Sequence, residues 1–143
     1  MEPLLKVENL RIELTTRSGV APVIDDLSFE LGAGESISFV GESGCGKSMT
    51  ALGIMGLLPD KIGRVASGSI TFNGEELTTA NDKRLREIRG NEISMIFQEP
   101  MASFAPAISI GDQMVEQLMI HTDFSKAQSK ELSIEMLDRV GIS

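Results

Sequence analysis

Apolar and polar residues alternate near the start of the chain, and this period of two is typical of half-buried β-strands. The alternation is clear over most of Leu4–Leu14 and looser over Pro22–Leu31. The polar segment Thr15–Gly19 lies between these two runs. We therefore predict two strands joined by a hairpin-like loop.

A third β-rich run, Ser36–Val40, leads directly into a glycine-rich loop over residues 41–46. After this loop, Lys47–Leu58 is mostly apolar and is followed by Pro59, which cannot continue a helix. The pattern predicts a largely buried helix, whose apolar side chains are Met49, Leu52, Ile54, Met55, Leu57 and Leu58. The glycine-rich loop is thus expected to connect a strand to a helix.

The middle of the chain contains a turn signal, a charged segment and another strand candidate. Asn73-Gly74 is a dipeptide that favours a tight hairpin turn. The charged residues 81–90 suit a short surface helix, and Glu92–Phe97 has the composition of a strand. The segment Gln98–Pro106 contains two prolines and little periodicity, which predicts a loop.

Two helices are predicted at the end of the chain, over Ser109–His121 and Ser125–Gly141. Ser125 has the residue type and the position of an N-cap. We expect the second helix to bury an apolar stripe formed by Leu132, Met136 and Val140.

Length and composition limit the classes of protein that the chain can belong to. With 143 residues, 41% of them hydrophobic, it is long enough for a globular domain with a core. No apolar run reaches the roughly 20 residues of a membrane span, and no signal peptide pattern is present. Together with the single cysteine, this predicts a cytoplasmic protein. The net charge of -8 argues against nucleic acid as a partner.

The glycine-rich loop matches the pattern G-x-x-x-x-G-K-[ST] with Gly41, Gly46, Lys47 and Ser48. Glycines let successive backbone N–H groups point inward, and the following helix adds its positive end, which together form a cradle for phosphate. The lysine can reach the β- and γ-phosphates, and the serine hydroxyl is a suitable ligand for Mg²⁺. The predicted nucleotide-binding residues are Gly41, Glu42, Ser43, Gly44, Cys45, Gly46, Lys47, Ser48 and Thr50.

The position of this loop within the chain indicates the class of P-loop protein to which the chain belongs. A kinase or small GTPase usually begins with its P-loop strand, whereas here two strands come first. The arrangement resembles the ATP-binding subunit of an ABC transporter. The segments "GESGCGKSMTALGIMGLLP" and "SMIFQEPMASFAPAISIGDQ" are similar to the dipeptide/oligopeptide permease family within it. The sequence departs from that family at Phe104-Ala105, where Leu-Asn is common.

The resemblance implies roles for residues outside the P-loop. Gln98 matches the glutamine-loop residue, which is expected to contact Mg²⁺ or the attacking water. Ser48 and Gln98 are thus the predicted metal ligands, and Gln98 is the predicted catalytic residue. The loop with Met101 and Phe104 is where such subunits meet their membrane partner, although both side chains could equally belong to the core. The family usually stacks adenine on an aromatic residue, but Leu14 stands in the matching region.

The resemblance also implies a fold and an assembly. We expect a partial α/β P-loop NTPase domain of the ABC type with an antiparallel β edge. Residues 1–108 would form the core, and residues 109–143 would begin a helical subdomain. The family's Walker B segment, signature motif and switch histidine are not found in the sequence, so we expect an N-terminal part that does not hydrolyse ATP alone.

The intact protein is expected to couple MgATP hydrolysis to import of peptides or related solutes. Its implied partners are integral membrane permease subunits and a second ATP-binding subunit, at the cytoplasmic face of the inner membrane. A soluble ABC-type ATPase of repair or translation and a P-loop kinase are the alternatives.

Overall fold

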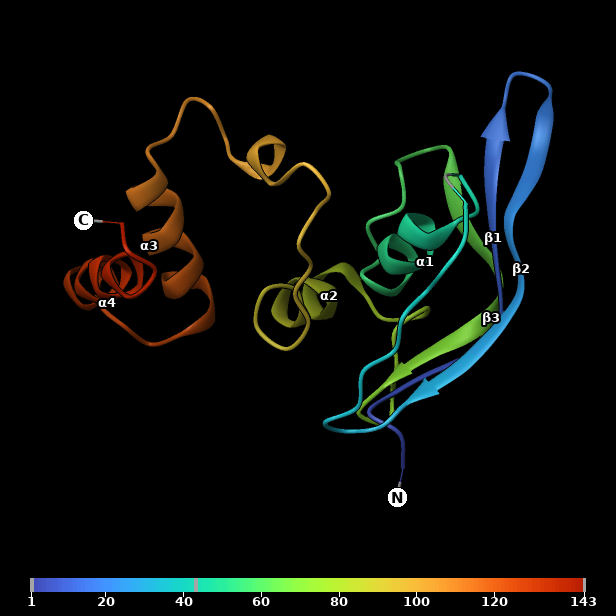
Figure 1. The fold of residues 1–143 in the computed structure, drawn as a ribbon, viewed down its shortest axis with the longest axis horizontal. Coiled ribbons are helices and arrows are strands. Elements are labelled where there is room, and N and C mark those ends of the chain that lie inside the picture. Colours follow the sequence, from blue (N-terminus) through green and yellow to red (C-terminus); the bar gives the residue numbers. More distant parts are fainter. Residues whose placement is uncertain (1, 43, 143) are drawn as a thin grey trace. The chain divides into compact units, whose positions relative to one another are not determined.

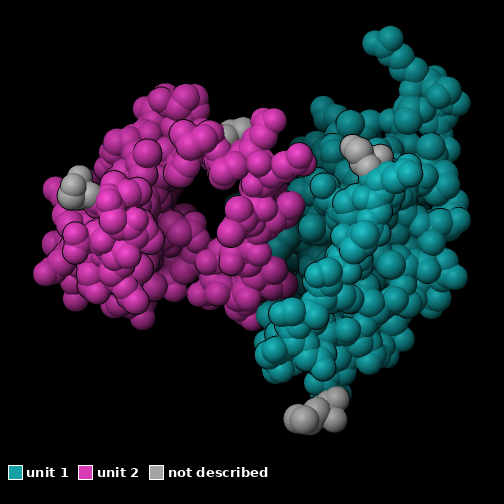
Figure 2. Space-filling view, in the orientation of Figure 1, with its two compact units in different colours: residues 1–86 teal, residues 87–143 magenta. Residues whose placement is uncertain are grey.

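The computed structural model describes residues 2–42 and 44–142 of the chain, apart from the side chain of Ala102. It divides into two compact units, Met1–Arg86 and Glu87–Ser143 (Figure 2). We predict a boundary after residue 108 between the core and a helical subdomain. That boundary rests on the expected functions of the two parts and not on how compactly they pack, so it stays a prediction.

The first unit is built on an antiparallel sheet. Strands β1 (Leu5–Thr16) and β2 (Gly19–Leu31) form the predicted hairpin, and β3 (Gly63–Phe72) pairs with the other edge of β1. The short β4 (Glu75–Glu76) completes the strand order β2-β1-β3-β4. The predicted antiparallel edge of the fold is thus present, and its strands curve together around one side of the unit (Figure 1).

The inner face of this sheet supplies most of the core of the first unit. Its buried side chains include Val7, Leu10, Ile12, Ile24, Ile70 and Phe72. Helix α1 (Lys47–Ile54) contacts β1, β2 and β3. A Cβ atom at Gly53 would lie 2.6 Å from Cδ1 of Ile12, so any larger residue there would require the Ile12 side chain or the helix to shift.

The helix after the glycine loop is shorter than predicted. It ends at Ile54 and not near Pro59, because Gly56 adopts a φ of 62° that breaks the helical path. Its buried residues are Thr50 and Gly53, followed by Met55 just beyond its end. The prediction of an apolar buried face was therefore wrong for most positions, because the close approach to the sheet favours small side chains.

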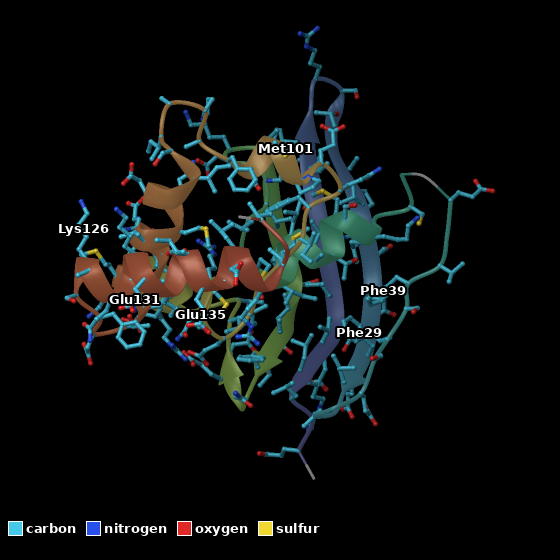
Figure 3. The ribbon with its side chains drawn as sticks, turned by 60° about the vertical axis from the view of Figure 1, so that its left-hand side comes forward. Phe29, Phe39, Met101, Lys126, Glu131 and Glu135 are labelled. Carbon is cyan, nitrogen blue, oxygen red and sulfur yellow. The ribbon has the colours of Figure 1, made fainter. Side chains whose placement is uncertain are left out.

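Two further runs predicted as strands, Ser36–Val40 and Glu92–Phe97, are not strands in the structure. A strand forms when its backbone groups pair with a neighbour over several residues. Among the described residues the two runs form no such ladder, and only Ile93 makes an isolated bridge, with Arg89. Val40 is accordingly 96% exposed and Ile96 is 92% exposed. The first run is held beside β2 by an edge-to-face contact of Phe39 with Phe29, with ring centroids 5.1 Å apart (Figure 3).

The Asn73-Gly74 turn is confirmed. Both residues have positive φ, 48° and 78°, as a tight hairpin turn requires, and they join β3 to β4. Helix α2 (Asp82–Ile88) follows, and its first turn is capped by the Asn81 side chain, which accepts a hydrogen bond from the Arg84 backbone.

The second unit contains η1 (Pro100–Ser103), α3 (Ile110–His121) and α4 (Lys126–Arg139). Ser109 caps α3, and the predicted N-cap Ser125 is confirmed, with Gln128 completing a capping box. None of the helices in the described part of the chain is long and apolar enough to span a membrane.

The buried face of α4 differs from the prediction. Ser129 and Ser133 are buried, whereas Val140 is 72% exposed and Met136 is also exposed. Helix α4 packs on α3, and its two buried serines are one helical turn apart and so lie on the same side of the helix. The Ser133 hydroxyl donates to the Ser129 carbonyl at 2.7 Å, so this hydroxyl has a hydrogen-bond acceptor although it is buried.

Candidate nucleotide-binding site

The glycine-rich loop connects the exposed segment after β2 to the first turn of α1. Gly44 and Gly46 have φ values of 84° and 93°, which side chains with a Cβ rarely adopt. Gly46 is the N-cap of α1, and as a glycine it has no side chain that could cap the helix. The N–H groups of the first helical turn are therefore left for an external acceptor, which is the property of an anion site.

Gly46 is also packed tightly against the second strand. A Cβ atom at this position would collide with Cδ1 of Ile24 and would lie 2.8 Å from the carbonyl oxygen of Val23. The start of α1 is thus pressed against the β2 backbone. This contact joins residues that are far apart in the sequence, so no local pattern could identify Val23 and Ile24 as supports of the loop.

Lys47 lies inside the curve of the loop. Its ammonium donates to the carbonyl oxygens of Gly41 at 2.6 Å and of Glu42 at 2.7 Å. It also lies 3.3 Å from Sγ of Cys45. The loop thus holds its one positive charge at the place where a bound phosphate would need it.

The Cys45 thiol is affected by the same charge. The hydrogen bond from the Lys47 ammonium lowers the pKa of the Cys45 thiol, against a smaller opposing effect of desolvation. The thiol lies close to the start of the loop, since a Cβ atom at Gly41 would lie 2.6 Å from its Sγ. Glycine at this position therefore leaves room for the Cys45 side chain.

The two hydroxyl residues of α1 differ in their surroundings. Ser48 is exposed, so its hydroxyl is accessible to a metal ion. Thr50 is 3% exposed, and its hydroxyl donates to the Gly46 carbonyl at 3.2 Å. A contact of Thr50 with an α-phosphate stays a prediction, and it would require that hydroxyl to rotate. Ser43 lies outside the described residues.

A pocket of about 290 Å³ adjoins the loop within the first unit. One wall comes from β2, at Val23–Leu27, and the other from Phe39, Cys45, Lys47 and Thr50. The donor set of the loop fits a phosphate group: backbone N–H groups, one ammonium and an uncapped helix start. No group of three or more His, Cys, Asp and Glu side chains that could hold a metal ion occurs in the described ranges.

Gln98 belongs to the second unit, where it lies exposed in the bend that precedes η1. Its predicted roles toward Mg²⁺ and water stay predictions. The neighbouring Met101 (labelled in Figure 3) is exposed. Phe104 is exposed too, so in this structure neither is a core residue.

Comparison with known proteins identifies the family. The family model "ABC transporter" matches residues 24–143. The chain is 44% identical over 142 residues to the dipeptide transport ATP-binding protein DppD of Bacillus subtilis, covering 99% of this chain and 42% of that protein. It is 46% identical over 139 residues to the oligopeptide transport ATP-binding protein OppD of Escherichia coli, covering 97% of this chain and 41% of that protein.

Solved structures agree on the fold. The ATP-binding cassette MJ0796, in a dimeric post-hydrolysis state with ADP and Pi, has a TM-score of 0.79 at 19% identity, over 94% of this chain and 56% of that one. The structure of CbiO1 from Clostridium perfringens has a TM-score of 0.65 at 23% identity, over 100% of this chain and 52% of that one. The predicted P-loop NTPase fold of the ABC type is thereby confirmed.

The chain spans about two fifths of the length of the curated relatives that it matches. The family match covers well over half of the chain, and it includes the loop that holds Lys47. Membership of this family implies nucleotide binding. This chain belongs to the ABC transporter family, of which it contains part of the ATP-binding cassette.

Proposed function

We propose that this chain carries the phosphate-binding part of an ATP-binding subunit that drives import of peptides or related small solutes. The observation that carries the proposal is the Lys47 ammonium, held inside a glycine loop at the uncapped start of α1. The relatives named as dipeptide and oligopeptide transport proteins support the assignment to peptide import, because they match nearly all of the chain.

In this function the loop residues bind and orient the triphosphate of MgATP. The N–H groups of the loop and the first turn of α1 would donate to phosphate oxygens. Lys47 would exchange the carbonyl oxygens of Gly41 and Glu42 for oxygens of the β- and γ-phosphates, a stronger pairing because both partners are charged. Ser48 would ligate Mg²⁺, and Gln98 would help to order the attacking water.

The proposed assembly includes integral membrane permease subunits and a second ATP-binding subunit, either identical or homologous. It places the intact protein at the cytoplasmic face of the inner membrane. The relatives named as dipeptide and oligopeptide transport ATP-binding proteins support this arrangement. The exposed Met101 and Phe104 are suited to the contact with the permease.

Two measurements test the proposal. Calorimetric titration of the chain with MgATP should give saturable binding that is lost when Lys47 is replaced by alanine. Co-purification of the tagged full-length subunit with integral membrane proteins should then separate a transporter from a soluble ATPase of repair or translation and from a kinase. A full-length subunit that purifies with ribosomes or DNA-repair proteins, and with no membrane protein, would refute the transport assignment.

A further inference from the structure

Three residues with left-handed backbone lie next to each other across the sheet of the first unit. Asn9 in β1, Asp26 in β2 and Gly68 in β3 have φ values of 47°, 57° and 89°. Such values are uncommon for residues other than glycine, and they persist where the surrounding structure holds them. We call these three residues the bulge row.

The pairing of the strands changes register at the bulge row. β1 has one extra residue at Asn9 relative to both of its neighbours, and β2 has one extra residue at Asp25–Asp26 relative to β1. An extra residue of this kind is a β-bulge, which bends its strand and increases the local twist. The bulges thus account for part of the curvature of β1 and β2 (Figure 1).

Hydrogen bonds from Asn9 hold the bulge row together. Its side-chain Nδ2 donates to Oδ1 of Asp26 at 2.7 Å, and its backbone N–H donates to Oγ of Ser28 at 2.8 Å. On the other side, a Cβ atom at Gly68 would lie 2.5 Å from the Asn9 carbonyl oxygen, so the β3 backbone passes close to Asn9. Asn9 therefore links the bulge of β1 to that of β2 through one side chain.

The bulged part of β2 also faces the phosphate loop. Val23–Leu27 form one wall of the pocket at the loop, and this range includes Asp26. Val23 is a further extra residue of β2. Its carbonyl oxygen and the Ile24 side chain are the groups that a Cβ atom at Gly46 would meet. A change in the path of β2 at Asp26 therefore moves the surface that supports the start of α1.

We propose that Asn9 is a positioning residue for the phosphate loop, and that it acts through its hydrogen bond to Asp26. This bond fixes the bend of β2, and the bend in turn sets where Gly46 and the first turn of α1 lie. Binding groups must be held within about 0.5 Å of the productive geometry, so a small shift of this support weakens binding. The inference rests on the proposed nucleotide binding, and it adds a residue outside the loop and its pocket.

The alternative is that the bond between Asn9 and Asp26 stabilises the sheet and has no effect on the loop. The bond is exposed, and an exposed hydrogen bond contributes modestly to the free energy of unfolding because water can replace it. The two roles differ in a fully folded protein, where only a positioning residue changes the affinity for MgATP.

The test uses the whole chain with Asn9→Gly, in which glycine accepts the left-handed φ and only the side chain of the bond is lost. Asn73→Gly is the matched control, because Asn73 has a φ of 48° and lies in the turn between β3 and β4, outside the lining of the pocket. Circular dichroism and urea unfolding define a temperature at which all variants are fully folded. Calorimetric titration there should show MgATP binding weakened about three- to tenfold by Asn9→Gly and changed less than about twofold by Asn73→Gly.

A second variant removes only the hydrogen-bond donor. Asn9→Asp keeps the size of the side chain and its tolerance of left-handed φ, but an ionised carboxylate has no N–H to donate to Asp26. It should weaken binding of MgATP at least as much as Asn9→Gly does. Its control, Asn73→Asp, makes the same charge change in the turn between β3 and β4. This pair decides the question if Asn9→Gly does not fold.

Labelling of Cys45 reports on the loop without nucleotide. Its Sγ lies 3.3 Å from the Lys47 ammonium, which favours the reactive thiolate. If Asn9→Gly displaces the start of α1, this contact weakens, and alkylation by iodoacetamide at neutral pH slows about twofold or more. Asn73→Gly should leave the rate unchanged. An unchanged chain that binds no MgATP would refute the proposed function, and these rates would still decide on the role of Asn9.

Two results would overturn the inference. The first is a folded Asn9→Gly variant whose MgATP affinity and Cys45 labelling rate equal those of the unchanged chain, so that the bond only stabilises the sheet. The second is an equal loss in Asn73→Gly, which would show that the effect does not depend on the bulge row.

Discussion

The Lys47 ammonium donates a 2.6 Å hydrogen bond to the carbonyl oxygen of Gly41, and it thereby ties the end of the phosphate loop to its beginning. A second bond, to the carbonyl of Glu42, strengthens this link. Lysine therefore has two roles at this position. It links the two ends of the loop through these hydrogen bonds, and it carries a charge that phosphate oxygens could bind in place of the carbonyl oxygens.

Replacement of this lysine should abolish nucleotide binding. We expect Lys47→Ala to weaken binding of MgATP by about 100-fold or more, since at least two charge-assisted hydrogen bonds are lost. The free energy of unfolding should change little, because the side chain forms no part of the core. Calorimetric titration measures the first quantity, and urea unfolding measures the second.

Lys83→Ala is the matched control for this variant, because Lys83 is exposed on α2 and does not line the pocket at the loop. It should bind MgATP as the unchanged chain does. Equal affinity in Lys47→Ala and in the unchanged chain would contradict the assignment of the P-loop.

The thiol of Cys45 should be unusually reactive. Its pKa is lowered by the hydrogen bond from Lys47, so at any pH below its ordinary pKa a larger fraction is thiolate. The rate of alkylation should rise with pH through a midpoint that lies below the pKa of an ordinary cysteine. Lys47→Ala should move this midpoint upward, and MgATP should slow the reaction by covering the loop.

Mass spectrometry after timed labelling with iodoacetamide gives these rates, with Cys45→Ser as the unreactive control. Two results would contradict the prediction: a midpoint that Lys47→Ala leaves unchanged, or equal labelling with and without nucleotide.

Two glycines of the loop allow strain and crowding to be separated. Both Gly44 and Gly46 have left-handed φ, so alanine at either costs about 1–2 kcal/mol of backbone strain. Only at Gly46 would the new Cβ also meet Ile24 and the Val23 carbonyl, whereas nothing lies within 4 Å at Gly44. Gly46→Ala should therefore reduce the free energy of unfolding by about 1–3 kcal/mol more than Gly44→Ala does. Urea unfolding of both variants tests this, and equal losses would show that the start of α1 is not packed against β2.

The loop could be predicted from sequence because its function requires particular residue types at fixed spacing. Gly41, Gly46 and Lys47 are such residues, and the Asn73-Gly74 turn is predictable for the same local reason. The segment Ser36–Val40 was not, because strand formation depends on a paired neighbour that lies elsewhere in the chain.

The residues that α4 buries could likewise not be predicted from the local sequence pattern. Apolar spacing on α4 pointed to Met136 and Val140, but the structure buries Ser129 and Ser133 where α4 meets α3. The hydrophobic pattern gives the residues that prefer burial. It does not give the distance between two elements, which decides whether large or small side chains fit.

The last prediction concerns turnover: the chain should bind MgATP and release no phosphate from it. We propose that the loop, with Lys47 and Ser48, supplies groups that bind and orient a triphosphate. The sequence contains no run of apolar residues followed by Asp-Glu, so the Walker B carboxylates that the family uses to hold Mg²⁺ and polarise water are not in it. A positioned general base contributes about 10²- to 10⁴-fold to a rate. Groups that close over the γ-phosphate add electrostatic stabilisation of the transition state, and those belong to the family's signature motif.

Gln98 cannot replace these groups, because an amide accepts no proton near neutral pH. Phosphate release by the purified chain should therefore equal that of the Lys47→Ala variant, measured side by side in a coupled phosphate assay. The comparison removes the contribution of contaminating ATPases, which would be the same in both preparations. A rate for the unchanged chain well above that of the variant would mean that a carboxylate of this chain, outside any Walker B pattern, acts as the base.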